Sequence, residues 1–479
     1  MNFAELAVFI IYLVAMVGIG LHFFLRSRGG NEKDYFLGGR QMGPWVSALS
    51  AGASDMSAWV LMGLPASIYA AGLGKAWIAI GLLIGYALSW IFEAPRLRRF
   101  SIEANDSITI PQYLTNRFLS KSKALQIVCA VIFILAYTVY AASSIKACGT
   151  LFNTVLGMNP TVAMYLAAAI IIAYTFLGGF PAVAWTDFFQ GMLMLAALMI
   201  APIFAWSLIE SGAHQASASF PEHFWSLTAD WKDIVSGLGW GLGYFGMPHI
   251  IIRFMAIRSD KDLKKSSVIG ITWTLIILTM SVVSGCVGRM FLGEIADSST
   301  VFIQLTRTIF PAIVSGILLS AILAASMSTA DSQLLAASSA FASDVYKPVF
   351  RKNASDNEML WAGRAVVLFI AVAALLIASD PNSGTIMGLV ENAWGVFGAA
   401  FGPAILLSLF WRKLSFAGAT AGIIAGAAVD ILWLMLLGST GIYEIIPGFF
   451  AGLIVAFLVS KVSGEPSKEV EELFDRATR

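Results

Sequence analysis

Apolar runs of 18 or more residues recur along the whole chain, and this feature constrains the fold more than any other. Runs of that length with few internal charges are long enough to cross a bilayer as α-helices. Charged residues make up only 12% of the 479 residues, whereas soluble proteins carry about 25%. The sequence therefore predicts an all-α polytopic membrane protein rather than a set of soluble domains.

The apolar pattern predicts thirteen membrane-spanning helices, and an odd number places the two termini on opposite sides of the membrane. The expected spans are 3–25, 43–71, 74–95, 124–148, 160–179, 185–209, 234–257, 267–292, 308–343, 359–378, 386–410, 415–437 and 441–461.

Lysine and arginine are concentrated in alternate segments between the spans, and this predicts the orientation. Basic residues follow the first span, whereas only Glu5 precedes it, so we expect an outside N-terminus and no cleaved signal peptide. The loop 210–233 is acidic apart from Lys232, as expected outside the cell. We expect a multi-pass plasma-membrane protein with a cytoplasmic C-terminus.

Several classes of function are not expected. A net charge of +1 provides no basic face for nucleic acid, and the three cysteines and four histidines do not cluster at metal-ligand spacing. No phosphate-loop, zinc-protease or nucleophile-elbow pattern is present. Gly241-Leu-Gly-Tyr-Phe-Gly246 matches the dinucleotide fingerprint but lies inside a span. We therefore expect no enzyme and no obligate protein partner.

The spans 43–71 and 234–257 differ from the others and predict helices that break near the middle of the membrane. The first is small and polar around Ser47–Ser57, and the second carries five glycines and a proline within 237–248. These two spans are five apart, so they open two five-helix units of opposite orientation. Interrupted spans at matching positions of two inverted repeats point to the binding site of a secondary transporter. Glycines that only allow close helix packing are the alternative for the second span.

Three groups of residues carry candidate chemistry inside these spans. Asp55 lies near the bilayer centre, where a carboxylate marks an ion or substrate path or makes a structural hydrogen bond. The segment 325–332 concentrates hydroxyl groups, which suit a hard cation but also bond back to the preceding helical turn. Trp240, Tyr244 and Pro248 share one face if the span is helical there, and such a face serves either a ligand or packing.

Five motifs resemble the sodium:solute symporter family, and the resemblance runs from about residue 30 to 460. They are Tyr35-Phe-Leu-Gly-Gly-Arg40, Ala48-Leu-Ser-Ala-Gly-Ala-Ser-Asp55-Met-Ser57, Gly179-Phe-Pro-Ala-Val-Ala-Trp185-Thr-Asp187, Gly239-Trp-Gly-Leu-Gly-Tyr-Phe-Gly-Met-Pro248-His, and Leu318-Leu-Ser-Ala-Ile-Leu-Ala-Ala-Ser-Met-Ser328-Thr329.

The resemblance implies a LeuT-type core of two inverted five-helix repeats and sodium-coupled uptake of L-proline across the bacterial inner membrane. We expect an N-terminal extra helix and loop at 1–42, repeats at 43–210 and 233–410, two further helices at 411–462 and a cytoplasmic tail at 463–479.

The resemblance also implies a role for particular residues. Those expected to bind the co-transported sodium are Ala53, Met56, Ala325, Ser328 and Thr329, with support from Asp55 and Ser57. Those expected to bind proline are Trp240, Tyr244, Pro248 and Tyr140. Asp187 is expected on the ion path and Arg40 at a functional cytoplasmic position.

Asp331 and Ser332 depart from the simplest family pattern, because some relatives carry small uncharged residues there. With Asp187 and Ser328 they predict a second oxygen-rich pocket. Asp331 there would hold a second sodium, share a proton or meet a basic residue, because a carboxylate in the membrane is rarely left unpaired.

Two alternatives to proline symport stay open at this stage. Sodium symport of another small solute, such as pantothenate, sialate or a sugar, is the first. A membrane-embedded solute sensor is the second, although fewer than twenty residues follow the last span.

Overall fold

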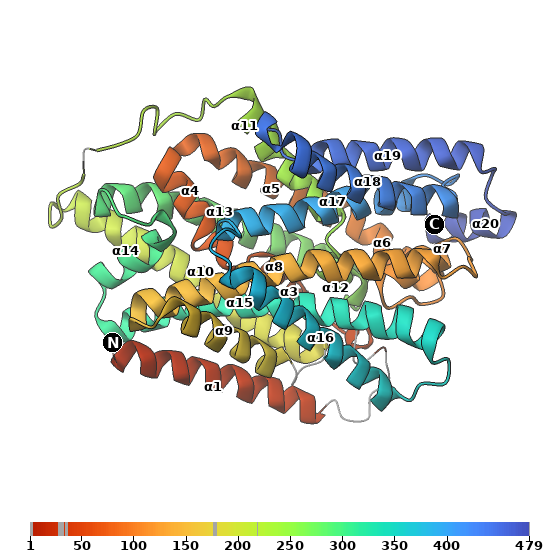
Figure 1. Cartoon of the computed structure of the whole chain (residues 1–479), viewed down its shortest axis with the longest axis horizontal. Coiled ribbons are helices and arrows are strands. Elements are labelled where there is room, and N and C mark those ends of the chain that lie inside the picture. The colour runs from red at the N-terminus through yellow and green to blue at the C-terminus, as the bar shows by residue number, and fades with distance from the viewer. Residues whose placement is uncertain (1–2, 27–32, 34–36, 176–179, 218, 479) are drawn as a thin grey trace.

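A computed structural model describes residues 3–26, 33, 37–175, 180–217 and 219–478. Within these residues the secondary structure is helical, apart from an isolated parallel bridge between Met42 and Ile257 (Figure 1). The predicted all-α class is confirmed. Parts of two motifs, at Tyr35, Phe36 and Gly179, lie outside the described residues.

The uninterrupted long helices coincide with expected spans. They are α1 (Phe3–Arg26), α8 (Ala124–Leu156), α9 (Pro160–Thr175), α10 (Phe180–Glu210), α13 (Asp260–Leu292), α15 (Ala312–Phe341), α16 (Asp356–Ser379), α17 (Ile386–Phe410), α18 (Phe416–Leu437) and α19 (Ile445–Val462). The span expected at 74–95 runs further, as α5 (Trp77–Leu88), the π-turn η4 (Ser89–Glu93) and α6 (Ala94–Glu103).

Ten helical stretches of the described residues are long and apolar enough to cross a membrane. The segments 58–71 and 160–173 are apolar but shorter, and the second broken span consists of short pieces. The number thirteen stays a prediction for this reason. One expected boundary is wrong: α14 (Val301–Ile309) ends before Pro311, which has extended backbone and caps the start of α15. The proline restricts the residue before it to extended conformations, so no helix runs through 308–312.

Both expected breaks are present. The first span divides into α3 (Pro44–Asp55) and α4 (Gly63–Ala71), with non-helical backbone at Met56 and Ser57 and a short 3-10 turn η2 (Ala58–Val60). The second divides into α11 (Trp231–Gly239), the 3-10 turn η5 (Trp240–Phe245) and α12 (Pro248–Ala256). Proline lacks an N–H and is favoured at a helix start, and the residue before it, Met247, is extended.

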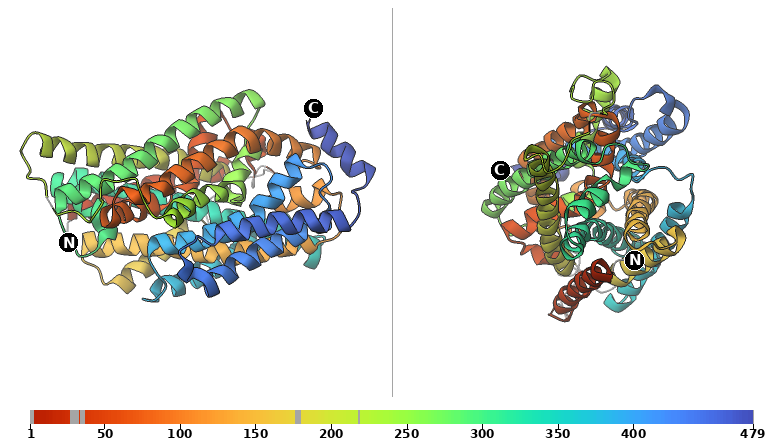
Figure 2. Two further views of the ribbon diagram at one scale, coloured as in Figure 1. Left: turned by 90° about the horizontal axis from the view of Figure 1, so that it is seen from above. Right: turned by 90° about the vertical axis from the view of Figure 1, so that its left-hand side faces the viewer.

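The two broken spans lie inside the bundle and the additional helices lie around it. α3 packs against α10, α12, α13 and α15, whereas α18 and α19 pack on α17. α1 lies on the outside of the bundle (Figure 2, right), in contact with α10 and α15. The tail, expected as a helix or a disordered end, forms α20 (Lys468–Thr478), which packs against α6 and α7 (Ile110–Arg117).

Candidate functional site

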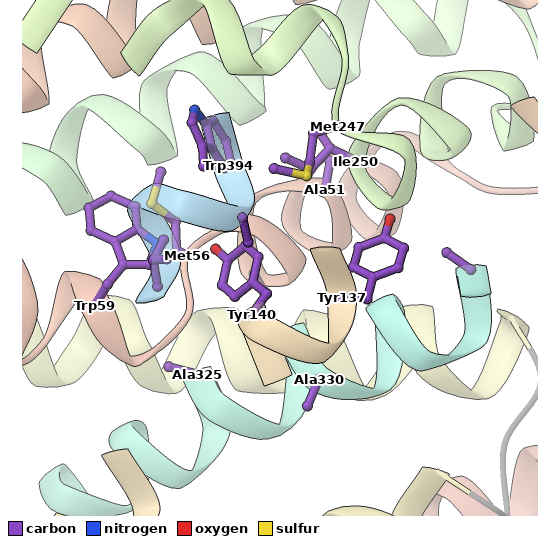
Figure 3. Packing of buried hydrophobic residues seen from close by; sticks show 14 of the residues in the cluster. Ala51, Met56, Trp59, Tyr137, Tyr140, Met247, Ile250, Ala325, Ala330 and Trp394 are labelled. Atoms are coloured by element: carbon purple, nitrogen blue, oxygen red, sulfur yellow. The ribbon is translucent and has the colours of Figure 1, made fainter. Parts of the chain in front are cut away.

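The end of α3 meets the middle of α15 at a cluster of buried oxygen atoms. The Ser328 hydroxyl donates to the carbonyl of Ala53 at 2.8 Å and lies 3.2 Å from the carbonyl of Ala325. The Thr329 hydroxyl lies 3.5 Å from the same Ala53 carbonyl. These residues are fully buried. Four of the five residues expected to hold sodium are therefore brought together, and the fifth, Met56, stands at the break itself (Figure 3).

This cluster fits a small hard cation. Sodium prefers several uncharged or weakly charged oxygen ligands, and the cluster offers two carbonyl and two hydroxyl oxygens. In the structure the Ser328 hydroxyl donates its hydrogen bond to the carbonyl of Ala53. A cation could bind between the Ser328 hydroxyl oxygen and the Ala53 carbonyl oxygen, because both oxygens have lone pairs that can coordinate it.

Asp55 lies two residues beyond Ala53 and is fully buried. Its Oδ2 accepts a hydrogen bond of 2.5 Å from the Tyr244 hydroxyl. Its Oδ1 has no hydrogen-bond partner among the described residues. Its carbonyl accepts from the Trp59 indole at 3.2 Å and from the Tyr140 hydroxyl at 3.4 Å. The break thus leaves polar groups that two tyrosines and a tryptophan contact.

Aromatic rings form a wall beside Asp55. Tyr244 makes edge contacts with Tyr86 at 5.1 Å and with Trp394 at 5.0 Å between ring centres. The Trp394 indole donates to the carbonyl of Trp240 at 2.8 Å. Figure 3 shows Trp394, Met56, Trp59 and Tyr140 around the point where α3 ends. Such a wall suits a small solute with an apolar body.

The expected common face of Trp240, Tyr244 and Pro248 is wrong as helix geometry. A 3-10 turn covers Trp240–Phe245, and the backbone leaves the helix before Pro248. Trp240 instead packs against Tyr443 with ring centres 5.1 Å apart, while Tyr244 faces Asp55. Pro248 is buried as the first residue of α12.

Arg253 in α12 is a buried residue that the sequence did not reveal as functional. Its Nη2 donates to Asp187 Oδ2 at 3.0 Å and to the Ser332 hydroxyl at 2.6 Å. Its Nε donates to the Ser50 hydroxyl at 3.0 Å, and Ser50 donates to Asp187 at 2.7 Å. Asp187 and Ser332 are thus together, as expected, but with a guanidinium between them. Asp331, the residue before Ser332, is fully buried, and its role stays a prediction.

His249 lies directly after the break, as the second residue of α12. Its Nε2 is 3.1 Å from the carbonyl of Ser54 and its Nδ1 is 3.3 Å from the Tyr137 hydroxyl. With Trp59, Tyr86 and Trp394 it belongs to the residues that sequence reasoning missed. The signal for Trp59 was its position one turn after Asp55.

Arg40 connects the segment before α3 to the C-terminal end of α12. Its guanidinium donates to the carbonyls of Met255 at 2.6 Å and Ser107 at 2.8 Å and to Asp106 at 2.8 Å. Burial raises the pKa of Asp106, but hydrogen bonds and charges from Lys33 and Arg40 outweigh this effect. The pKa of Asp106 therefore lies below the ordinary value of 3.8.

Two broken helices that meet at Asp55 and Tyr244, beside a buried cluster of oxygen atoms, are typical of a secondary transporter. The chain belongs to the sodium:solute symporter family, whose model matches residues 35–426. The high-affinity proline transporter PutP of Bacillus subtilis is 44% identical over 462 residues, which cover 95% of this chain and 97% of that protein. The sodium/proline symporter of Escherichia coli is 41% identical over 486 residues, which cover 98% of this chain and 96% of that protein.

Solved structures show the same fold. A Na+-coupled sialic acid symporter in a substrate-bound outward-open state has a TM-score of 0.79 at 20% identity, covering 98% of this chain and 99% of that one. The nucleobase-cation-symport-1 family transporter Mhp1 has a TM-score of 0.59 at 15% identity. The predicted LeuT-type core of inverted repeats is confirmed at the level of the fold.

Proposed function

We propose that this protein takes up L-proline together with sodium by alternating access between the two sides of the bacterial inner membrane. The relatives that are 41–44% identical over nearly the whole chain are named as proline transporters or sodium/proline symporters. One observation of the structure carries the proposal of coupling. Ala53 belongs to the oxygen cluster and Asp55 to the aromatic wall, and both lie in the last turn of α3.

The oxygen cluster is the proposed sodium site, with ligands from Ala53, Met56, Ala325, Ser328 and Thr329. Because these atoms adjoin the break, a bound sodium would fix the orientation of the last turn of α3. The orientation of that turn sets the position of the Asp55 carboxylate.

The proposed proline site lies on the other side of the break. Trp240, Tyr244, Pro248 and Tyr140 would surround the pyrrolidine ring, and Asp55 with Ser57 would support the polar end and the ion. Proline is a zwitterion. The N-terminal and C-terminal ends of the interrupted helices carry partial positive and negative charges, which suit its carboxylate and its ammonium group. Sodium that favours the proline-binding state must in turn bind more tightly when proline is present.

The driving force is sufficient for concentrative uptake. Moving one sodium ion through 100 mV releases about 2.3 kcal/mol, and a tenfold sodium gradient adds about 1.4 kcal/mol. Together these sustain an accumulation of proline of several hundred-fold.

The same proposal includes the topology. The N-terminus would lie outside and the C-terminus in the cytoplasm. The inverted repeats would comprise 43–210 and 233–410, preceded by the extra helix within 1–42 and followed by helices within 411–462 and the tail 463–479.

Uptake of labelled proline into proteoliposomes tests the proposal. We expect accumulation with an inward sodium gradient and none with an equal potassium gradient at the same membrane potential. Equal accumulation in both would disprove sodium coupling. Unlabelled pantothenate, sialate and glucose serve as competitors, and competition by one of them stronger than by proline would reassign the substrate.

A further inference from the structure

We propose that the guanidinium of Arg253 is a built-in cation that occupies the place of a second sodium ion and so limits the protein to one sodium per transported solute. This inference rests on the proposed function for its solute. Its observations are the contacts of a single buried side chain with four core helices.

The guanidinium of Arg253 donates to four hydrogen-bond acceptors and lies over the ring of Phe180, 5.4 Å from its centre. Asp187 of α10 and Ser332 of α15 accept from Nη2, and Ser50 of α3 accepts from Nε. Nη1 donates to the carbonyl of His249, one turn earlier in α12. Ser50 also donates to the Asp187 oxygen that Nη2 contacts, which closes a ring of hydrogen bonds. The side chains of Arg253 and Asp187 are 3% and 0% exposed, so water does not solvate the pair.

The pair lies directly beside the proposed sodium site. Ser50 precedes Ala53 by one helical turn in α3, and Ser332 follows Ser328 by one turn in α15. The two helices that supply the sodium site therefore also supply two hydroxyls to Arg253. The guanidinium of Arg253 therefore occupies the layer of polar atoms next to the sodium site, which consists of Ser50, Asp187 and Ser332.

The acceptors of Arg253 have the chemistry of a sodium site. One carboxylate oxygen and two hydroxyl oxygens converge on the guanidinium, and hard monovalent and divalent cations use the same oxygen groups. The guanidinium forms an ion pair of 3.0 Å with the Asp187 carboxylate, and arginine is the residue of choice for such buried pairs. A mobile cation is excluded from the layer by the volume and by the charge of Arg253. The sequence analysis predicted a second oxygen-rich pocket at Asp331, Asp187, Ser328 and Ser332 that would hold a sodium, share a proton or meet a basic residue. At Asp187 and Ser332 the basic residue is Arg253.

Removal of the guanidinium should convert the layer into a second sodium site. In Arg253→Gln the Asp187 carboxylate loses its counter-charge, and a buried carboxylate without one must acquire a cation or a proton. At alkaline pH, where protons are scarce, we expect sodium to enter. The sodium dependence of uptake should then become steeper, with a Hill slope that rises from one towards two.

The sodium-to-proline ratio, measured from the reversal potential of proline flux in proteoliposomes, is the decisive quantity. We expect one for the wild-type protein, between one and two for Arg253→Gln, and one again for the double variant Arg253→Gln/Asp187→Asn, in which the anion is also removed. Arg253→Lys keeps a tethered cation and should keep a ratio of one. A ratio of one in Arg253→Gln at alkaline pH, or of two in the wild type, overturns the proposal.

Equilibrium binding of radioactive sodium to the purified wild-type protein without proline gives an independent answer if Arg253→Gln does not fold. One sodium per chain supports the inference and two overturn it. This measurement also separates the two proposals. A protein that binds one sodium but does not transport proline would contradict the proposed solute and leave the role of Arg253 standing.

Discussion

The last turn of α3 is short of hydrogen-bond partners for its own backbone, and other helices supply them. Hydroxyls of α15 bond to Ala53, and side chains from η2 and α8 bond to Asp55. A displacement of α15 would therefore shift Ala53 and, two residues further along the backbone, Asp55. The short separation between the ion site at Ala53 and the solute site at Asp55 is the physical basis that we propose for coupling.

Replacement of Thr329 by alanine tests the ion site at the residue scale. The change removes one oxygen near Ala53, and an interaction with a charged partner contributes about 1.5–3 kcal/mol. We expect the apparent affinity for sodium to fall roughly tenfold to a hundredfold, with a smaller effect on maximal uptake at saturating sodium. Thr329→Ser keeps the hydroxyl and is the matched control. An unchanged sodium dependence in both Thr329→Ala and Ser328→Ala would contradict the placement.

Asp106 predicts a pH dependence of stability. Its pKa in the folded protein lies below 3.8 because Lys33 and Arg40 outweigh burial. The carboxylate therefore stabilises the fold above about pH 3.8, and this contribution disappears as the pH falls through the lowered value. The difference in Tm between wild type and Asp106→Asn, measured in detergent, should be constant from pH 7 to pH 5 and shrink towards pH 3. A difference that persists unchanged at pH 3 would show that the charge is irrelevant.

Individual site residues differed in how well the sequence revealed them. Asp55, Ser328 and Thr329 were visible because they interrupt apolar runs. Arg253 was not, since an arginine near the cytoplasmic end of a span usually extends its charge to the membrane surface. Only the fold shows that Asp187, 66 positions away, turns it inward.

Glycines in the second broken span allow the close helix packing that the sequence offered as one alternative. A Cβ at Gly237 would lie 2.7 Å from the backbone of Trp77 in α5, so close packing is one purpose. A Cβ at Gly246, where the span breaks, would lie 2.5 Å from the carbonyl of Phe397 in α17. The glycines therefore bring the backbone on both sides of η5 close to α5 and α17, while the helix itself is interrupted at Met247, before Pro248. Composition predicted that this element differs from the other spans, but the contacts of each glycine depend on its neighbours in the fold.

Gly241→Ala is expected to destabilise this element. The added methyl would lie 2.4 Å from the carbonyl oxygen of Gly81, and overpacking of this kind costs about 1–3 kcal/mol. We expect a lower Tm in detergent and weaker proline binding. Gly18→Ala in α1 is the control, because its Cβ would meet no atom within 4 Å. Equal Tm values for the two variants would contradict the close approach of α5 and η5.

Different short helices lie at the two ends of the molecule. Figure 1 places α4 and α14 near the end that holds the N-terminus, and α6, α7 and α20 at the end that holds the C-terminus. Arg412 in the second end bonds to Glu471 and Asp475, which ties α20 to the bundle. Hydropathy alone predicted the long helices of the bundle, because a bilayer permits few other structures, but it did not predict the short helices α7 and α14. The arrangement of the helices relative to one another depends on contacts between spans that are far apart in the sequence, and the hydropathy pattern of a single span does not predict these contacts.

Labelling of introduced cysteines tests the orientation of the two ends. The three natural cysteines are buried, whereas Glu222 and Glu469 are exposed at opposite ends. We expect a membrane-impermeant maleimide to label Glu222→Cys in intact cells and Glu469→Cys only after the membrane is opened. The reverse pattern would place the N-terminus in the cytoplasm.

The position of α1 on the outside of the bundle has a consequence for biosynthesis. Glu5, near its start, bonds to Arg307, which is 302 positions later in the chain. At about 5–20 residues per second, a ribosome needs roughly 15–60 s to synthesise that interval. During this interval α1 lacks the Arg307 partner of Glu5, and a factor that shields an incompletely packed helix in the lipid has this interval in which to act.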